Sequence, residues 1–382
     1  MSLNKVYITK TGNFFPNDPV SNDEMEEYLG LIGGKPSKAK KIVLRNNGIK
    51  RRFYALTKAG KATHTNAQMT ALAIRNLFAD DAEGLKSIDL LSCGTSSPDQ
   101  MMPSHGVMVH GWLPETGAIE VVSPSGVCCA SMHAFKYAYM AVKTGEVNNA
   151  VSTGSERFSP SLKSVFFEDE VKNLTALEEN PYISFEKDFL RWMLSDGAGA
   201  FLLSDKKNEN GISLVVEWIE GVSYAHEKET CMYMACDKEE DGSLKSYLDY
   251  SPAEIMSHSV LSIKQDVKLL SENIVSLGGT YLKSLFSRKG LNIEEIDYFL
   301  PHVSSEFFRQ KIDQKLKENG MAIPPEKWFV TLSNIGNVGA GSIYLMVDEL
   351  FNSGRLKIGE KMLLMVPESS RFSYMFALLT VC

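Results

Sequence analysis

Two adjacent cysteines, Cys128 and Cys129, stand where a polar turn is followed by a helical pattern in SPSGVCCASMHAFKYAYMAVKTG. Small residues recur at helical spacing in this stretch, for example at Ala134 and Ala138, so we expect a buried helix over residues 130–143. A cysteine at the N-terminus of such a helix lies beside unpaired main-chain N–H groups and the positive end of the helix dipole, which both favour the thiolate. The pair therefore offers a candidate nucleophile, whereas the ordinary alternative is that both cysteines are small apolar core residues.

His302 and Asn337 are two further polar residues that follow apolar, strand-like segments. His302 ends IDYFLPH, and Asn337 lies in IGNVGAGS just after WFVTL. Proteins of the α/β class place their sites at the carboxyl ends of buried strands. A cysteine, a histidine and an asparagine at three such points would combine a thiolate nucleophile with two neutral hydrogen-bond donors.

Strand-like and helical segments alternate along the chain, which predicts an α/β fold with parallel strand pairing. We expect a long helix over residues 260–287 and a strand over 328–332 that leads to Asn337. A strand, a turn and a second strand are expected over 193–204. These elements would position the polar residues at strand ends and helix starts.

The second half of the chain repeats this alternation from a new strand near residue 212. Two apolar segments, 361–370 and 372–381, are expected to close the chain as a β-hairpin. The pattern therefore predicts two copies of one βα arrangement, in residues 1–205 and 206–382.

The composition is that of an ordinary globular protein, with 382 residues, 44% of them hydrophobic, and a net charge of −7. The negative charge argues against a general nucleic-acid binder. No apolar run reaches the roughly 20 residues that a membrane helix needs, and no signal peptide is recognised, so we expect a cytoplasmic protein that does not bind membranes. Cys231 and Cys236 have four residues between them, not two, and no histidine pair behind them, which does not fit a zinc site.

Several motifs occur in an order that resembles the beta-ketoacyl-[acyl-carrier-protein] synthases III, condensing enzymes of the thiolase superfamily. They are VYITKTGNFFPNDPVSNDEMEEYL with NNGIKRRFYA, SCGTSSPDQMMPS, VKTGEVNNAVSTGSE, SDGAGA, PHVSS and SNIGNVGAGSIYLMVDELFNSGRLKIGEKMLLM. The likeness covers nearly the whole chain, and GRLKIGEKMLL after the asparagine motif is quite specific. It implies a thiolase-like five-layer αβαβα fold made of two related halves, usually as a homodimer. The half 1–205 would carry the nucleophilic cysteine, and the half 206–382 the histidine and the asparagine.

The family's nucleophile is a cysteine at the N-terminus of the central helix, and two alignments compete for it here. The pair Cys-Ala would select Cys129. The family places the glycine of the helix-end motif 17 residues after the nucleophile, and Gly145 is 17 residues after Cys128. A gap inside the helix would rotate its small-residue face by about 100°. We therefore predict that Cys128 is the nucleophile and that Cys129 is a buried neighbour.

The resemblance also implies the chemistry. Cys128 would take an acyl group from a thioester, and a malonyl thioester would then lose carbon dioxide and attack the acyl-enzyme. His302 and Asn337 would donate hydrogen bonds to the thioester oxygen as the enolate forms. The backbone N–H groups of Cys128 and Ser370 would form the oxyanion hole, although Ser370 stands in SSRF where the family has G-G-G-F.

Substrate preference is expected to differ from the family's. Met102 stands where the family's F-P-S loop places an aromatic residue that closes the acyl pocket, and methionine adapts its shape more easily. We therefore expect acyl donors longer than acetyl. The family's CoA-contacting arginine is Asn46 here, which favours delivery by an acyl carrier protein. Acyl-CoA or acyl-carrier-protein thioesters and malonyl-carrier protein are the expected substrates, with no cofactor and no metal ion.

A basic segment near the N-terminus has two interpretations that the sequence leaves open, a solvated face or part of a landing site for an acidic carrier protein. Its residues are Lys38, Lys40, Lys41, Lys50, Arg51 and Arg52. Two polar insertions, between Arg157 and Arg191 and between Tyr224 and Tyr250, either decorate the surface or modify the entrance and the acyl pocket.

The sequence as a whole favours an acyltransferase of the 3-oxoacyl-[acyl-carrier-protein] synthase III type, in fatty-acid or polyketide-type biosynthesis. The alternative is a non-catalytic thiolase-fold partner subunit of a heteromeric synthase. The presence of Cys128, His302 and Asn337 together favours the enzyme.

Overall fold

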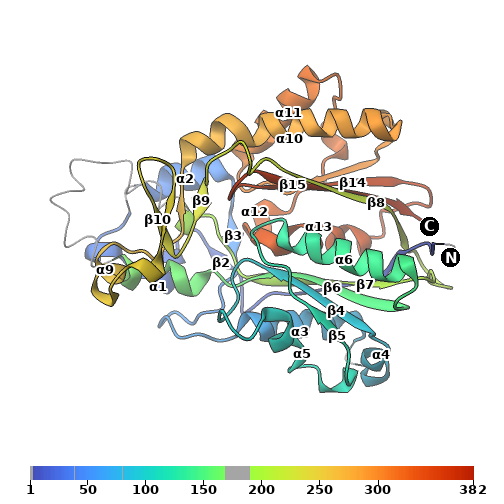
Figure 1. Cartoon of the computed structure of the whole chain (residues 1–382), viewed down its shortest axis with the longest axis horizontal. Coiled ribbons are helices and arrows are strands. Elements are labelled where there is room, and N and C mark those ends of the chain that lie inside the picture. The colour runs from blue at the N-terminus through green and yellow to red at the C-terminus, as the bar shows by residue number, and fades with distance from the viewer. Residues whose placement is uncertain (1–2, 38, 80, 168–189) are drawn as a thin grey trace.

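The computed structural model describes residues 3–37, 39–79, 81–167 and 190–382 (Figure 1). Within these residues, nine strands form one hydrogen-bonded sheet, whose two parts lie on opposite sides of a central helical layer. The first part contains β1 (Tyr7–Phe14), β7 (Gly197–Ser204), β6 (Asn149–Glu156), β4 (Leu90–Thr95) and β5 (Glu120–Val122). The second contains β8 (Leu214–Ser223), β15 (Ser373–Val381), β14 (Lys361–Glu368) and β13 (Tyr298–Pro301).

Both parts of the sheet have the same topology. They join where β1 pairs with β8, and from this junction the order is β1, β7, β6, β4 on one side and β8, β15, β14, β13 on the other. On each side the two pairs nearest the junction are antiparallel and the next pair is parallel. Two related halves produce this repetition, as the sequence predicts. The expected boundary near residue 205 falls in the connection between β7 and β8 and stays a prediction.

Helices complete the layers on both sides of each part of the sheet (Figure 1). The central layer holds one helix from each half, α6 (Ala130–Thr144) and α13 (Ser342–Phe351). One outer layer consists of α3 (Asn66–Leu77) and α5 (His105–His110), and the other of α10 (Val267–Lys289) and α11 (Glu306–Glu318). The layers therefore follow the order α, β, α, β, α, which confirms the predicted five-layer fold.

The remaining α-helices in the described ranges are short. They are α1 (Met25–Leu29), α2 (Lys40–Asn47), α4 (Ala82–Lys86), α9 (Pro252–Ser257) and α12 (Leu332–Ile335). Three short strand pairs accompany them: β2 (Val20–Ser21) with β3 (Arg51–Arg52), β9 (Met232–Tyr233) with β12 (Lys264–Gln265), and β10 (Cys236–Lys238) with β11 (Leu244–Ser246). Apart from α4 and α12, these elements gather at one end of the layers, on the left of Figure 1. Of these elements, β9 and β12 contribute Met232 and Gln265 to the lining of the cavity that is described below.

Three of the expected elements differ from the structure. The helix expected from residue 260 begins at Val267, because Asp266 caps it by accepting the N–H of Leu269 at 2.9 Å. The expected strand over 328–332 is replaced by an irregular segment that leads into α12, in which Trp328 forms only an isolated bridge with Phe299. Asn337 therefore lies in a loop between helical turns, and no strand precedes it directly.

The third difference lies in residues 193–204, which form one strand, β7, after an irregular segment. The side chain of Asp196 explains the irregularity. Its buried carboxylate accepts the main-chain N–H groups of Ala55, Phe158 and Ser159 at 2.7–2.9 Å, which two neighbouring segments would otherwise leave unpaired. Burial raises the pKa of this carboxyl group.

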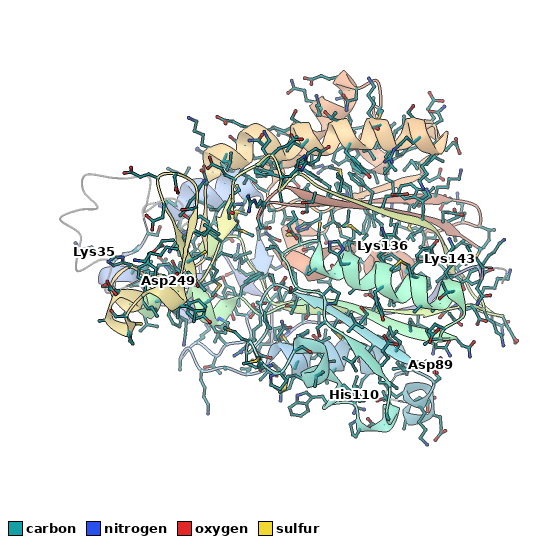
Figure 2. All side chains as sticks on the ribbon, in the orientation of Figure 1. Lys35, Asp89, His110, Lys136, Lys143 and Asp249 are labelled. Carbon is teal, nitrogen blue, oxygen red and sulfur yellow. The ribbon has the colours of Figure 1, made fainter. Side chains whose placement is uncertain are left out.

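None of the helices in the described ranges is long and apolar enough to cross a membrane. Charged side chains such as Lys35, Asp89 and Asp249 lie at the periphery and are exposed (Figure 2).

The start of α6 lies in direct contact with strands of the first sheet part. A Cβ added at Gly94 on β4 would lie 2.4 Å from the carbonyl oxygen of Ala130. A Cβ added at Gly154 on β6 would lie 2.7 Å from the Cβ of Ser131. Only glycine allows this approach, so the strands fix the position of the helix that follows the two cysteines.

Replacing Gly94 by alanine should destabilise the protein by about 1–3 kcal/mol, because the added methyl group overpacks the contact with the main chain of α6. Urea unfolding of the wild type and of Gly94→Ala measures the difference. Gly111→Ala is the matched control, since its Cβ would have no contact shorter than 3.4 Å and its φ of −60° suits alanine. Equal losses for both variants would contradict the proposed packing.

Candidate active site

A single cavity brings Cys128, His302 and Asn337 together. All three line it, although they come from the start of α6, the end of β13 and the loop after α12. The cavity contains about 740 Å³ of space that no atom occupies, part of it open to solvent. Residues that are far apart in the sequence thus meet at one site, as the sequence predicts for these three.

Cys128 and Cys129 have different surroundings. Cys128 lies two residues before α6, is 8% exposed and lines the cavity. Cys129 is 1% exposed, does not line the cavity, and directs its Sγ to the carbonyl oxygen of Val366 on β14 at 3.3 Å. The geometry therefore agrees with the choice of Cys128 as the accessible thiol, while its acylation stays a prediction.

The electrostatic setting of Cys128 differs from the sequence-based expectation of a stabilised thiolate. The main-chain N–H groups of Val127 and Cys129 both donate to Oε2 of Glu368, at 3.1 and 3.0 Å. Burial raises the pKa of the Cys128 thiol well above its usual value, and the nearby charges of Glu368 and Glu156 raise it further. The expectation was wrong, first because burial disfavours the thiolate, and second because Glu368 takes up the N–H groups that were expected to favour it.

His302 lies one residue after β13, as expected, and is buried at the cavity wall. Its main-chain N–H donates to the carbonyl oxygen of Met365 at 2.8 Å, which continues the pairing of β13 with β14. Burial lowers the pKa of the imidazole to about 4, so the ring is neutral near pH 7. A neutral imidazole has one N–H to donate, which suits a developing oxygen anion in the cavity.

Asn337 is held by main-chain and side-chain hydrogen bonds. Its N–H donates to Met193 at 3.0 Å and its carbonyl oxygen accepts from Ser195 at 2.9 Å. The side-chain Oδ1 accepts the N–H of Gly339 at 3.0 Å, which leaves the amide nitrogen as the donor toward the cavity. Gly336 has φ of +73°, so this turn needs glycine directly before the asparagine.

Ser370 lies in the turn between β14 and β15. Its carbonyl oxygen accepts the N–H groups of Cys231 and Met232, at 2.7 and 3.1 Å, and its Oγ donates to Oε1 of Glu368 at 2.7 Å. Ser369, its neighbour, is the residue of this turn that lines the cavity. The role of the Ser370 N–H in an oxyanion hole stays a prediction.

Met102 does not line the cavity of its own chain. It is 86% exposed, in the loop that precedes α5. The expectation that this residue closes the acyl pocket is therefore not met within a single chain.

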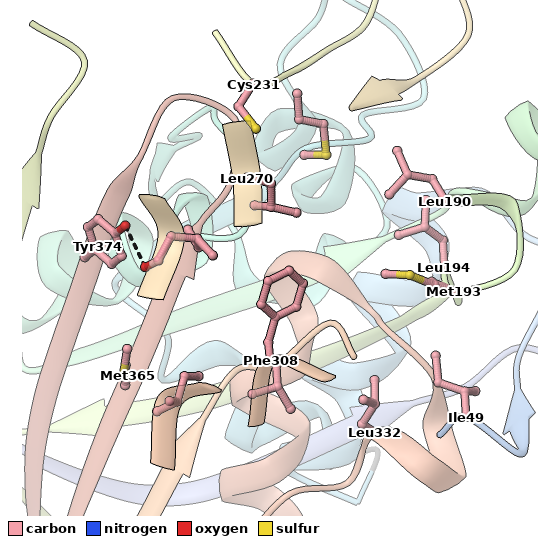
Figure 3. Close-up of a cluster of buried hydrophobic side chains, with 14 of the residues drawn as sticks. Ile49, Leu190, Met193, Leu194, Cys231, Leu270, Phe308, Leu332, Met365 and Tyr374 are labelled. Atoms are coloured by element: carbon pink, nitrogen blue, oxygen red, sulfur yellow. Dashed lines mark hydrogen bonds between the residues drawn. The ribbon is translucent and has the colours of Figure 1, made fainter. Parts of the chain in front are cut away.

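The wall away from the three polar residues is apolar and belongs mainly to α10, α11 and the segment before β7. Figure 3 shows part of it, with Leu270 of α10 and Phe308 of α11 pointing toward one another. Further lining residues are Leu190, Met193, Leu194, Met232, Ile263, Ile274, Val275 and Ile312. Sequence reasoning did not identify this wall, because it combines α10 and α11, which are separated in the chain by residues 290–305.

Both insertions contribute residues to the cavity. Met232, in the insertion between Tyr224 and Tyr250, lines it, and this segment forms β9, β10 and β11. Phe158 and Leu190, in the insertion between Arg157 and Arg191, line it as well, whereas residues 168–189 lie outside the described residues.

Sequence reasoning also missed two buried carboxylates, Glu156 and Glu368. Glu156 accepts from the N–H of Ala340 at 3.0 Å and from the Oγ atoms of Ser96 and Ser97, so it ties the loop after Asn337 to the ends of β4 and β6. Burial raises its pKa to about 7. Only the acidic residue type at the end of a buried strand could have drawn attention to it.

The basic segment is only partly a solvated face. Lys41, Lys50 and Arg51 are exposed, and Lys40 forms an ion pair with Glu26 at 2.8 Å. Arg52 is fully buried and donates to Asn22 and to the main chain of Trp192, so it belongs to neither the solvated face nor a landing site. Lys38 lies outside the described residues. In the described ranges no group of three or more His, Cys, Asp or Glu residues could hold a metal ion.

Comparison with known proteins gives consistent results. The sequence profile of the 3-oxoacyl-[acyl-carrier-protein] synthase III C-terminal domain matches residues 286–366. The beta-ketoacyl-[acyl-carrier-protein] synthase III of Clostridium acetobutylicum is 25% identical over 371 residues, with 94% of each chain covered. That of Allorhizobium ampelinum is 26% identical over 361 residues, again with 94% of each chain covered.

Solved structures show the same fold. AbyA1, described as a tetronic acid condensing enzyme, superposes with a TM-score of 0.74 at 19% identity, covering 98% of this chain and 99% of that chain. Xanthomonas campestris OleA with bound lauric acid and lauroyl-CoA gives a TM-score of 0.73 at 19% identity with the same coverage. This chain is thus similar to the beta-ketoacyl-[acyl-carrier-protein] synthases III over 94% of its length, and it shares the fold of AbyA1 and OleA.

Proposed function

We propose that this protein is an acyltransferase that performs a decarboxylative Claisen condensation through an acyl-cysteine intermediate. The observation that carries the proposal is that Cys128, His302 and Asn337 line one cavity with an apolar wall. Relatives that match 94% of the chain are named beta-ketoacyl-[acyl-carrier-protein] synthase III. A non-catalytic partner subunit would not need a thiol and two neutral donors around one enclosed space.

The proposed reaction has two stages. In the first, the Cys128 sulfur attacks the carbonyl carbon of an acyl thioester, and the donor thiol leaves. In the second, a malonyl or related thioester binds and loses carbon dioxide, and its α-carbon attacks the acyl-enzyme. His302 and Asn337 donate hydrogen bonds to the thioester oxygen, where negative charge develops during decarboxylation.

The proposed substrates are an acyl donor on CoA or on an acyl carrier protein and an extender on a carrier protein. The exposed residues Lys41, Lys50 and Arg51 offer positive charge for an acidic carrier. We further propose a homodimer that works in the cytoplasm in fatty-acid or polyketide-type biosynthesis, without a cofactor or a metal ion.

Incubation with acyl thioesters should place the acyl group on Cys128. Intact mass will show the adduct, and peptide mapping will locate it. Cys128→Ala should abolish the adduct, whereas the matched variant Cys129→Ala should keep it, because Cys129 does not line the cavity. An acyl group on Cys129 of the wild type would contradict the assignment, and no adduct with any donor would contradict the proposed function.

His302→Ala and Asn337→Ala should still become acylated but should lose condensation by about 10²–10³-fold, because each removes one donor to the enolate oxygen. Single-turnover assays measure acylation, and product formation from the isolated acyl-enzyme measures condensation. His133→Ala, an exposed histidine on α6, controls for the loss of an imidazole. Near wild-type condensation in both site variants would show that these residues have another role.

Acylation efficiency should rise from acetyl to medium-length acyl chains. Each methylene group that becomes buried should improve the binding free energy of the acyl donor by about 0.8 kcal/mol. The apolar wall on α10 and α11 should set the limit. Ile274→Trp, which narrows the cavity at this wall, should therefore shift the preference to shorter acyl donors. A competition between acetyl and octanoyl thioesters, measured by intact mass, tests this.

Two further variants complete this test. Ser276→Trp, at an exposed position of the same helix, should leave the preference unchanged. Met102→Trp would shift the preference only if the Met102 loop reaches the cavity of a partner subunit. A wild-type preference for acetyl-CoA would refute the expectation of longer chains.

A further inference from the structure

A buried carboxylate lies directly beside the proposed nucleophile. Glu368 is the last residue of β14 and is 8% exposed. Its Oε2 lies 3.1 Å from the main-chain nitrogen of Val127 and 3.0 Å from that of Cys129. These two nitrogens belong to the residues before and after Cys128, so the carboxylate is bonded to the main chain on both sides of the proposed nucleophile.

The hydrogen bonds of Glu368 leave one acceptor position free. Each carboxylate oxygen has about two lone-pair positions. Oε2 uses both for the two N–H groups, and Oε1 uses one for the Oγ of Ser370 at 2.7 Å. In the described ranges no Lys, Arg or His forms an ion pair with this carboxylate. The second position of Oε1 can therefore accept a proton.

A negative charge at the start of α6 interacts favourably with the helix dipole, but it also affects the nearby thiols. A serine or asparagine side chain would also accept the N–H groups at the start of the helix, and it would add no charge. The charge of Glu368 acts on Cys128, Cys129 and His133, and for the Cys128 thiol it works against ionisation. A thiol that ionises so poorly needs a base at the moment of attack.

The other polar groups of the cavity are poor bases. Accepting a second ring proton would make His302 a buried cation, and burial lowers the pKa of this imidazole to about 4. Asn337 cannot accept a proton in this range. The carboxylate of Glu156 already accepts hydrogen bonds from the Oγ atoms of Ser96 and Ser97 and from the N–H of Ala340.

We propose that Glu368 is the general base that accepts the proton of the Cys128 thiol during acyl transfer. This inference rests on the proposed function. As the S–H proton moves to the carboxylate, the sulfur lone pair forms the new bond to the carbonyl carbon. The bond from that carbon to the donor sulfur then breaks, and Glu368 returns its proton to the leaving thiolate. The products are the acyl-enzyme, a free donor thiol and the original carboxylate, so protons and electrons balance.

Glu368→Gln tests the proposal because glutamine keeps the size and one oxygen acceptor but cannot take up a proton. Single-turnover acylation near pH 7 should be slower by about 10²-fold or more. The rate of the variant should then rise about tenfold per pH unit, because only free thiolate reacts, whereas the wild type should show a flatter profile. Glu217→Gln on β8 removes an exposed charge of the same kind and should behave as the wild type.

Alkylation of Cys128 by iodoacetamide against pH gives an independent readout. Removing the charge should lower the thiol pKa in Glu368→Gln, so this variant should be alkylated faster and acylated more slowly than the wild type. A carboxylate that merely restrains the thiolate would make both reactions faster in the variant, and this result would overturn the proposal. Unchanged acylation with an unchanged pH profile would also overturn it.

Glu368→Asp covers the case in which glutamine prevents folding, as judged by thermal unfolding. Aspartate keeps the proton acceptor, so it should acylate faster than any folded variant without a carboxylate at this position. Equal loss of acylation in folded Glu368→Asp and Glu368→Gln would contradict the proposal. Should the wild type itself accept no acyl group, the proposed function fails, while the alkylation profiles still report whether Glu368 and Cys128 are coupled.

Discussion

The contact between the start of α6 and both parts of the sheet determines the geometry of the site. On one side, Gly94 lets β4 approach the main chain of Ala130 as closely as two backbones can pack. On the other side, β14 reaches the same turn through the carbonyl oxygen of Val366 and the carboxylate of Glu368. The helix start is thus fixed between the two halves of the chain, and Cys128 lies at their junction. A shift of either sheet part would move the nucleophile.

The two hydrogen-bond donors also depend on the contact between the halves, but here the first half supports residues of the second. His302 and Asn337 belong to the second half, but residues of the first half hold the asparagine loop through Met193, Ser195 and the bond from Ala340 to Glu156. Each half therefore supplies part of the chemistry and part of the support for the other half. This interdependence explains why neither half alone would have a complete cavity.

Much of this arrangement could be predicted from the sequence, because the relevant signals are local. The small residues of α6, the buried strand before His302 and the glycine that precedes Asn337 are all visible in short segments, and the structure brings these three elements together. The irregular backbone before Asn337 could not be predicted from the sequence, because WFVTL has the composition of a strand. Only the contacts of Trp328 with distant residues show that it pairs as an isolated bridge.

Other features depend on distant segments and could not be derived from local patterns. Arg52 has the same residue type as its exposed neighbours, but the chain buries it against Asn22 and Trp192. In the sequence, Glu368 is an ordinary polar residue near the end of an expected strand, and its role depends on residues 127–129, about 240 positions earlier in the chain. Motifs therefore identified which residues meet, but not the charge that surrounds them.

That charge changes how the nucleophile has to work. A cysteine at an open helix N-terminus can rest as a thiolate, ready to react but exposed to unwanted alkylation and oxidation. Here burial and two carboxylates keep Cys128 protonated, and a neutral histidine adds no compensating cation. Ionisation then has to coincide with the arrival of an acyl carbonyl, whose developing negative oxygen can be met by neutral N–H donors. The site thus favours a reaction in which proton removal and attack are coupled, and in which the reactive sulfur anion does not persist without substrate.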